Sequence, residues 1–138
     1  MASYNKFNSF VEAIAEKVHN LGADTLTVAL TAAANAPVAG NTILANLTQI
    51  AYTNLSTRAI TVSASAQTSG TYKLTCTDLV LSASGGAVAT FRYVAIYNDT
   101  ATSDELIAWF GYGSDVTLAS GESLTLDFDG VNGLLQIA

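Results

Sequence analysis

Two apolar stretches decide the fold: residues 91–97 read Phe-Arg-Tyr-Val-Ala-Ile-Tyr, and residues 106–112 read Leu-Ile-Ala-Trp-Phe-Gly-Tyr. Both are rich in β-branched and aromatic residues, and both are followed by polar residues that favour turns. Apolar side chains on both alternating faces are typical of a central strand that is covered on each side. The two stretches therefore predict neighbouring central strands of a sheet, with residues 98–105 as the loop between them.

Shorter stretches on either side of this pair predict further strands. Apolar and polar residues alternate with a period of two at residues 26–30, 60–64, 72–76, 79–81, 116–118, 124–128 and 134–137. Turn signals such as Ser84-Gly85-Gly86 separate them. About eight strands with turn signals at intervals of roughly 8–12 residues are typical of a β-sandwich or barrel.

The N-terminal region has helical periodicity instead. One stripe collects its apolar side chains, which are Phe7, Phe10, Val11, Ile14, Val18 and Leu21. This spacing predicts an amphipathic helix over about residues 5–21, with Ser9 and Glu12 as a capping box. We therefore expect residues 1–138 to form a single mostly β domain. Its fold would be an antiparallel, jelly-roll-like β-sandwich, with strands from about residue 25 onward and one N-terminal amphipathic helix.

Composition argues against several classes of partner. The net charge is −6, and the five Lys and Arg residues are scattered along the chain. Binding to nucleic acid or to an anionic membrane surface relies on clustered cations, so neither partner is expected. Residues 1–20 contain charged side chains and no continuous apolar core, so no signal peptide is expected, and no stretch is apolar enough for a transmembrane span.

Residues that carry chemistry are few. His19 is expected in the last turn of the helix, exposed to solvent, where the helix dipole favours a positive charge. Cys76 alternates with polar residues and is expected in the core. The carboxylates in residues 99–105 and at Asp127 and Asp129 predict a solvated acidic face, with a divalent-cation site as the alternative. We predict no enzymatic activity, and no catalytic, cofactor-binding or metal site.

Aromatic side chains gather on the two central strands. They are Tyr93, Tyr97, Trp109, Phe110 and Tyr112. The favoured interpretation is that they form the sandwich core. An exposed platform that stacks on sugars, or an interface patch, remains as the alternative, although few polar residues are interleaved to bind the sugar hydroxyl groups.

Several segments resemble a family of small virion proteins, the capsid cement (decoration) proteins of tailed bacteriophages, such as that of a Bordetella podophage. The segments that carry this resemblance are residues 4–12, 15–22, 26–31, 69–74, 91–93, 97–100 and 121–129. The resemblance spans nearly the whole chain. It implies a jelly-roll-like structural protein on the outer surface of the capsid, bound as a homodimer to a major capsid protein with the HK97-like fold.

A second hypothesis is a receptor- or glycan-binding module of a phage tail or head fibre, with Trp109 on an exposed aromatic surface. An enzyme such as a glycan hydrolase ranks last, because Asp127 and Asp129 are too close in sequence to face one another across a pocket. Three segments are predicted as contact regions: the N-terminal helix with the residues before it, and the loops 31–42 and 98–105.

Overall fold

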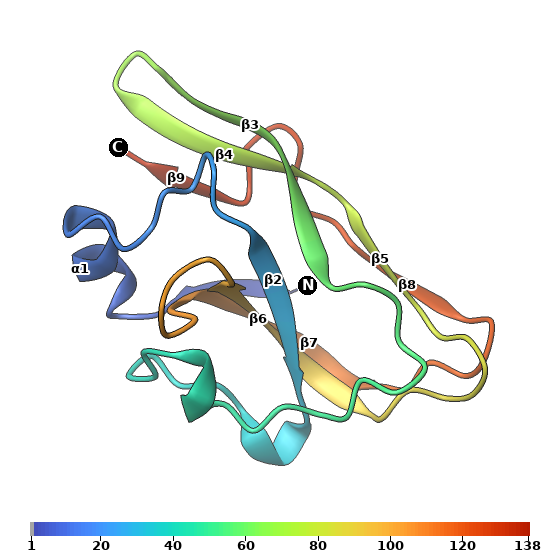
Figure 1. The fold of residues 1–138 in the computed structure, drawn as a ribbon. Helices are drawn as coiled ribbons and strands as arrows, with labels where there is room; N and C mark the ends of the chain where they lie inside the picture. The colour runs from blue at the N-terminus through green and yellow to red at the C-terminus, as the bar shows by residue number, and fades with distance from the viewer. Residues whose placement is uncertain (1) are drawn as a thin grey trace.

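A computed structural model describes residues 2–138 as a mostly β protein. A seven-stranded antiparallel sheet curls into a half-barrel, accompanied by a two-stranded sheet and one short helix (Figure 1). The strands are β1 (Ser3–Lys6), β2 (Leu26–Thr31), β3 (Ala59–Thr68), β4 (Thr71–Thr77), β5 (Leu79–Ser82), β6 (Phe91–Asn98), β7 (Leu106–Val116), β8 (Ser123–Leu126) and β9 (Leu135–Ile137). The helical segments are α1 (Phe10–Ala15) and the 3₁₀ turns η1 (Ala33–Asn35) and η2 (Leu44–Asn46). The large sheet has the order β1-β7-β6-β2-β3-β4-β9, and β5 pairs with β8.

The two apolar stretches form central strands, as predicted. β6 lies between β2 and β7 and is antiparallel to both. Its side chains alternate between two cores: Val94 and Ile96 belong to the main core, whereas Ala95 and Tyr97 belong to a second, smaller core on the other face. The apolar character of both faces thus reflects burial on both sides of the sheet.

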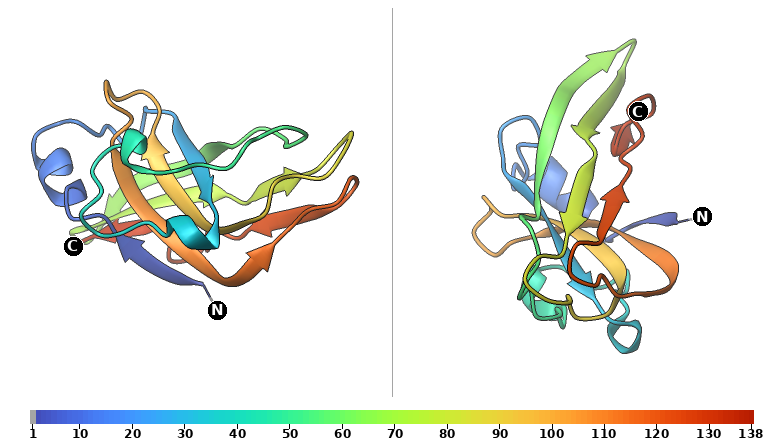
Figure 2. Two further views of the ribbon diagram at one scale, coloured as in Figure 1. Left: turned by 90° about the horizontal axis from the view of Figure 1, so that it is seen from below. Right: turned by 90° about the vertical axis from the view of Figure 1, so that its right-hand side faces the viewer.

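The large sheet is strongly curled (Figure 2). The main core lies on its inner side. β2 and β3 are joined by only two residue pairs, Leu26 with Ile60 and Thr27 with Ala59. Beyond this short pairing the sheet bends, which brings β3, β4 and β9 over the inner face of β6 and β7. The buried side chains on the inside come from both halves and include Val28, Leu30, Ile60, Leu74, Cys76, Leu81, Val94, Ile96, Ile107 and Leu135.

The second core covers the outer face of the central strands. Its buried members are Phe7, Ala29, Ala95, Tyr97 and Leu106. Leu44 and Leu47 pack against them from the long connection between β2 and β3, which crosses this face. Asn46 fixes η2 in this connection, because its side-chain oxygen accepts hydrogen bonds from the backbone N–H groups of Thr42 and Ile43.

The prediction of one helix over residues 5–21 was wrong, because the N-terminal region forms a strand followed by a short helix. Residues Ser3–Lys6 form the edge strand β1, and α1 covers only Phe10–Ala15. Phe7 explains the extended conformation before the helix, because its side chain is fully buried in the second core and its N–H donates to the carbonyl of Ile107. The helix ends early because Lys17 has φ of 64°, a left-handed conformation that ends a right-handed helix.

The predicted capping box is also absent. Ser9 has helical backbone angles, φ −66° and ψ −17°, and its side chain makes no capping hydrogen bond. The residues of the predicted apolar stripe also do not share one buried face, since Phe10 is buried whereas Val11 is 54% exposed. Helical spacing therefore misled the prediction, because Phe7 belongs to an extended segment and not to a helical turn.

Candidate functional site

A groove runs along the open side of the half-barrel, where the sheet does not close. Its two hollows have volumes of about 420 and 230 Å³. They share Phe110, Asp127 and Phe128, so they form one feature, which we call the seam groove. One wall is β1 with the adjoining part of β7, and the other is the chain from β8 to β9 (residues 124–136). In the larger hollow the exposed lining is mainly apolar, and the smaller hollow is lined chiefly by Phe91, Val94, Phe110, Tyr112, Leu124 and Leu126.

The outer edge of β1 faces solvent at this groove. Within residues 2–138, β1 pairs with β7 along one side only. The N–H of Phe7 donates to the carbonyl of Ile107, its direct partner, at 3.2 Å. Hydrogen-bonded and non-hydrogen-bonded pairs alternate in antiparallel sheets, so the backbone groups of Tyr4 and Lys6 point away from β7. β1 therefore presents free donors and acceptors beside the groove.

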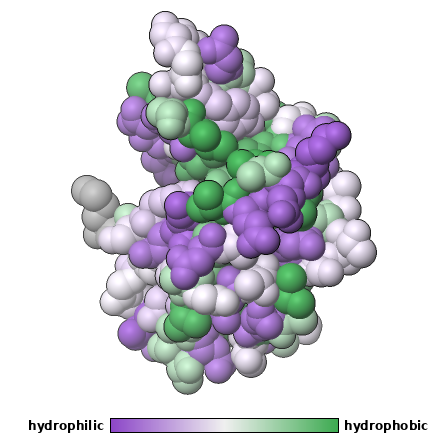
Figure 3. All heavy atoms as spheres, turned by 90° about the vertical axis from the view of Figure 1, so that its left-hand side faces the viewer, coloured by the Kyte–Doolittle hydropathy of each residue, from purple (hydrophilic) through white to green (hydrophobic). Residues whose placement is uncertain are grey.

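The side chains of β1 and β7 form the apolar wall. Tyr4 lies opposite Phe110 in the register, and their rings meet edge to face with centroids 5.5 Å apart. Phe110 packs against the main core, whereas Tyr4 is 43% exposed and Tyr112 is 52% exposed. Figure 3, which views the molecule from the side that carries α1, shows apolar surface in a recess beneath the β3–β4 hairpin.

Carboxylates line the other wall of the seam groove. Asp129 is fixed by three hydrogen bonds, because its carboxylate accepts from the backbone N–H groups of Val131 and Asn132 and from the Asn132 side chain. These hydrogen bonds, from Asn132 first, hold the pKa of Asp129 below its ordinary value. Asp127 accepts from the backbone N–H of Asp129 at 2.9 Å. This wall is thus negatively charged at neutral pH, and Lys6 is the cation on the facing wall.

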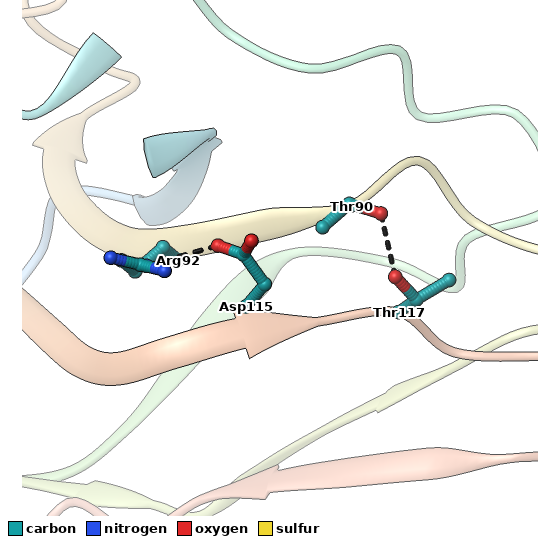
Figure 4. A network of polar contacts seen from close by, with 4 residues as sticks. All are labelled: Thr90, Arg92, Asp115 and Thr117. Atoms are coloured by element: carbon teal, nitrogen blue, oxygen red, sulfur yellow. Dashed lines mark hydrogen bonds and ion pairs between the residues drawn. The ribbon is translucent and has the colours of Figure 1, made fainter. Parts of the chain in front are cut away.

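The only ion pair within residues 2–138 lies elsewhere, on the exposed surface of β6 and β7. Arg92 Nε is 2.9 Å from Asp115 Oδ1, and beside it the hydroxyl groups of Thr90 and Thr117 are 2.6 Å apart (Figure 4). Both contacts join the beginning of β6 to the end of β7. Exposed ion pairs contribute little to the free energy of unfolding. We therefore interpret these contacts as part of the pairing of β6 with β7 and not as a functional site.

His19 is buried, which corrects the prediction of an exposed helix-end histidine. Its ring stacks on Phe10 with centroids 5.5 Å apart, and Asn98 Nδ2 lies 3.0 Å from its Nδ1. The same Asn98 amide donates to Asp24 at 2.6 Å. Burial lowers the pKa of His19, against the opposing effect of the Glu105 and Asp24 carboxylates. This cluster connects the segment after α1 to the C-terminal end of β6.

The remaining predicted residues have structural surroundings. Cys76 is buried in the main core, as predicted, and burial raises the pKa of its thiol to about 11. Trp109 is half-buried against Phe7, with ring centroids 4.5 Å apart, so that this part of its surface is covered. The chain just after the predicted contact loop 31–42 lies beside the predicted contact loop 98–105, because the Leu44 N–H donates to the Asp104 carbonyl. The role of the two loops as contact regions stays a prediction.

The described part of the chain, residues 2–138, contains no group of three or more His, Cys, Asp and Glu side chains placed to hold a metal ion. No helix in the same residues has the length and apolar character needed to cross a membrane. The seam groove is therefore the candidate site. It combines apolar side chains, free backbone groups and fixed carboxylates, an arrangement suited to binding.

Comparisons with known proteins give no relative to set beside this geometry. No protein-family model matches the chain, and neither a curated protein nor a solved structure matches it significantly.

Proposed function

We propose that this chain is a structural virion protein, a capsid cement protein of a tailed bacteriophage. It binds the exterior of a shell built from an HK97-like major capsid protein and stabilises that shell. The observation that carries the proposal is the sequence resemblance, which spans nearly the whole chain. The segments that carry it are residues 4–12, 15–22, 26–31, 69–74, 91–93, 97–100 and 121–129. In this proposal the chain is not an enzyme, and it acts as a homodimer on the outer surface of the capsid.

The proposal includes a finer description of the fold, a jelly-roll-like sandwich. Its support is the bend between β2 and β3, which lays β3, β4 and β9 over β6 and β7 with one core between them. Asp78 separates β4 from β5, and its carboxylate accepts from the N–H of Phe128, which lies just after β8. The two-stranded sheet then continues the second layer.

Charge and surface also support a place on the outside of a shell. A net charge of −6 suits the exterior better than a lumen packed with DNA. A cement protein must bury surface on its neighbours, and the seam groove offers apolar side chains together with a free strand edge. Free strand edges bind extended segments by adding a strand to the sheet.

The copy number of the chain in purified virions tests this function. Quantitative mass spectrometry against the major capsid protein should give a ratio near that of the capsid protein. Particles from which the chain has been removed should then burst at a lower temperature, and adding back the purified chain should restore their stability. A handful of copies per particle would contradict the proposal and would point instead to a tail or fibre component.

A further inference from the structure

We propose that the seam groove docks an extended segment of a partner protein, which pairs with the free edge of β1 as an added strand. The segment alternates apolar and polar residues and carries a Lys or Arg that lies beside Asp127. The docking mode is inferred from this chain alone. The identity of the partner, the shell subunit, rests on the proposed function.

The backbone of β1 provides the first argument. Tyr4 and Lys6 direct their N–H and C=O groups away from β7, and no other described strand pairs with them. An added strand would make hydrogen bonds with both residues while leaving the β1–β7 ladder intact. It would lie between β1 and the chain from β8 to β9, on the open side where the half-barrel does not close.

The side chains of the groove define what the segment carries. Successive side chains of a strand point to opposite faces, so every second side chain of the added strand would point into the groove. Those positions would meet Tyr4 and Phe110, which carry most of the exposed apolar surface, on one wall. On the other wall they would meet Phe128 and Leu134, which are buried except for 5% and 6% of their surface. Apolar side chains fit there, because exposed apolar surface beside buried core residues is favourable to cover. The outward positions of the segment remain polar.

Charge distinguishes a basic partner from a second copy of this chain. Asp127 and Asp129 line a further hollow with Ala2, Phe110 and Gly130, and no cationic side chain is part of this lining. Lys73 acts on Asp129 from outside the hollow, so Asp127 is the carboxylate left for a partner's cation. Two copies meeting at this groove about a two-fold axis would bring these carboxylates together, and each copy has a net charge of −6. A segment with a Lys or Arg gains an attraction at the same place.

Selection from a display library of short random peptides tests the proposal, with the purified full chain as bait. The enriched peptides should alternate apolar and polar residues and carry a Lys or Arg. Their synthetic forms are then titrated against two matched variants. Lys6→Pro blocks the free edge at one residue, whereas Lys6→Ala makes the same change of charge and keeps the N–H.

We expect Lys6→Pro to weaken peptide binding about tenfold, equivalent to about 1.4 kcal/mol, because it removes a donor and places a ring at the docking edge. Lys6→Ala should stay within about threefold of the wild type. Asp127→Asn keeps the oxygen that accepts from the N–H of Asp129, so it should weaken binding of the cationic peptides severalfold and reduce the salt dependence. Asp127→Asn still tests the proposal if Lys6→Pro fails to fold.

Three outcomes of the peptide and sedimentation experiments would overturn the proposal. The first is selection that enriches no alternating sequences, and the second is equal peptide binding by Lys6→Pro and Lys6→Ala together with no effect of Asp127→Asn. The third is a wild-type dimer in sedimentation that Lys6→Pro converts to a monomer, because a second copy would then occupy the groove.

Titration of the wild type and Lys6→Pro onto stripped capsids separates this inference from the proposed function. If the wild type does not bind capsids although the peptides dock, the proposed function fails and the docking mode remains. If Lys6→Pro covers capsids as tightly as Lys6→Ala, the groove is not the docking site and the cement function remains.

Discussion

Replacing Phe7 and Val11 separately by alanine distinguishes the observed N-terminal structure from a continuous helix. In a helix over residues 5–21 the two side chains would lie four residues apart on the same apolar face. In the structure Phe7 is fully buried in the second core, whereas Val11 is 54% exposed on α1. Phe7→Ala should therefore cost about 3–5 kcal/mol of the free energy of unfolding, which is typical of a buried aromatic side chain. Val11→Ala should change it by no more than about 0.5 kcal/mol.

Urea unfolding and thermal unfolding of the two variants measure this difference. Domains of this size have a total stability of about 5–15 kcal/mol, so Phe7→Ala should lower Tm by about 10 °C or more. Amide hydrogen exchange should also become faster at Ser3 and Asn5, which pair with β7, because Phe7 anchors the strand. Equal losses of stability in the two variants would refute the assignment of β1 and restore the helix.

Three further predictions concern single residues. Gly133→Ala should cost about 2–3 kcal/mol in urea unfolding, because φ is +82° and the new Cβ would lie 2.6 Å from the carbonyl oxygen of Leu74. Its control Gly130→Ala, with nothing within 4 Å of the added Cβ, should stay within about 0.5 kcal/mol. Because burial holds the pKa of His19 below 6.5, the unfolded chain gains a proton that the folded chain does not, so stability should fall as pH drops below about 6.5, and His19→Gln should flatten that slope. The Cys76 thiol, buried and with its pKa raised to about 11, should react with a thiol reagent at about pH 8 only as fast as the chain unfolds, so rapid reaction of the folded protein would contradict its placement.

An element could be predicted from the sequence where its local pattern of apolar residues matched the burial of those residues in the fold. β6 and the first part of β7 were predicted correctly because their apolar residues are nearly continuous and both faces are covered. The prediction of a separate strand at residues 116–118 was wrong, because β7 continues through exposed polar residues to Val116. β1 was missed because Ser3–Lys6 is short and mostly exposed and its pairing partner lies more than a hundred residues away in β7. No local pattern reports such a contact, and the helical spacing that begins at Phe7 favoured the wrong element.

The surroundings of the polar residues likewise depend on contacts between distant parts of the chain, which the sequence pattern does not report. His19 was expected at a helix end, and its burial depends on Asn98 and Phe10, which only the tertiary fold brings to it. The seam groove had one usable signal, because Asp127 and Asp129 were recognised as an acidic pair. Their position opposite Tyr4 and Lys6 follows from the missed strand, so the groove could not be predicted without β1.

The placement of β1 connects the fold to the proposed docking site. A continuous helix over residues 5–21 would leave β7 as the edge of the sheet and would remove the wall that Tyr4 and Lys6 contribute to the groove. β1 has four residues and depends on Phe7 for its anchor. An added strand would pair with β1 on its free side and so should slow hydrogen exchange there as well as bind. Peptide binding that leaves the exchange of the Tyr4 and Lys6 amides unchanged would therefore exclude strand addition, even if the apolar side chains of the groove were covered.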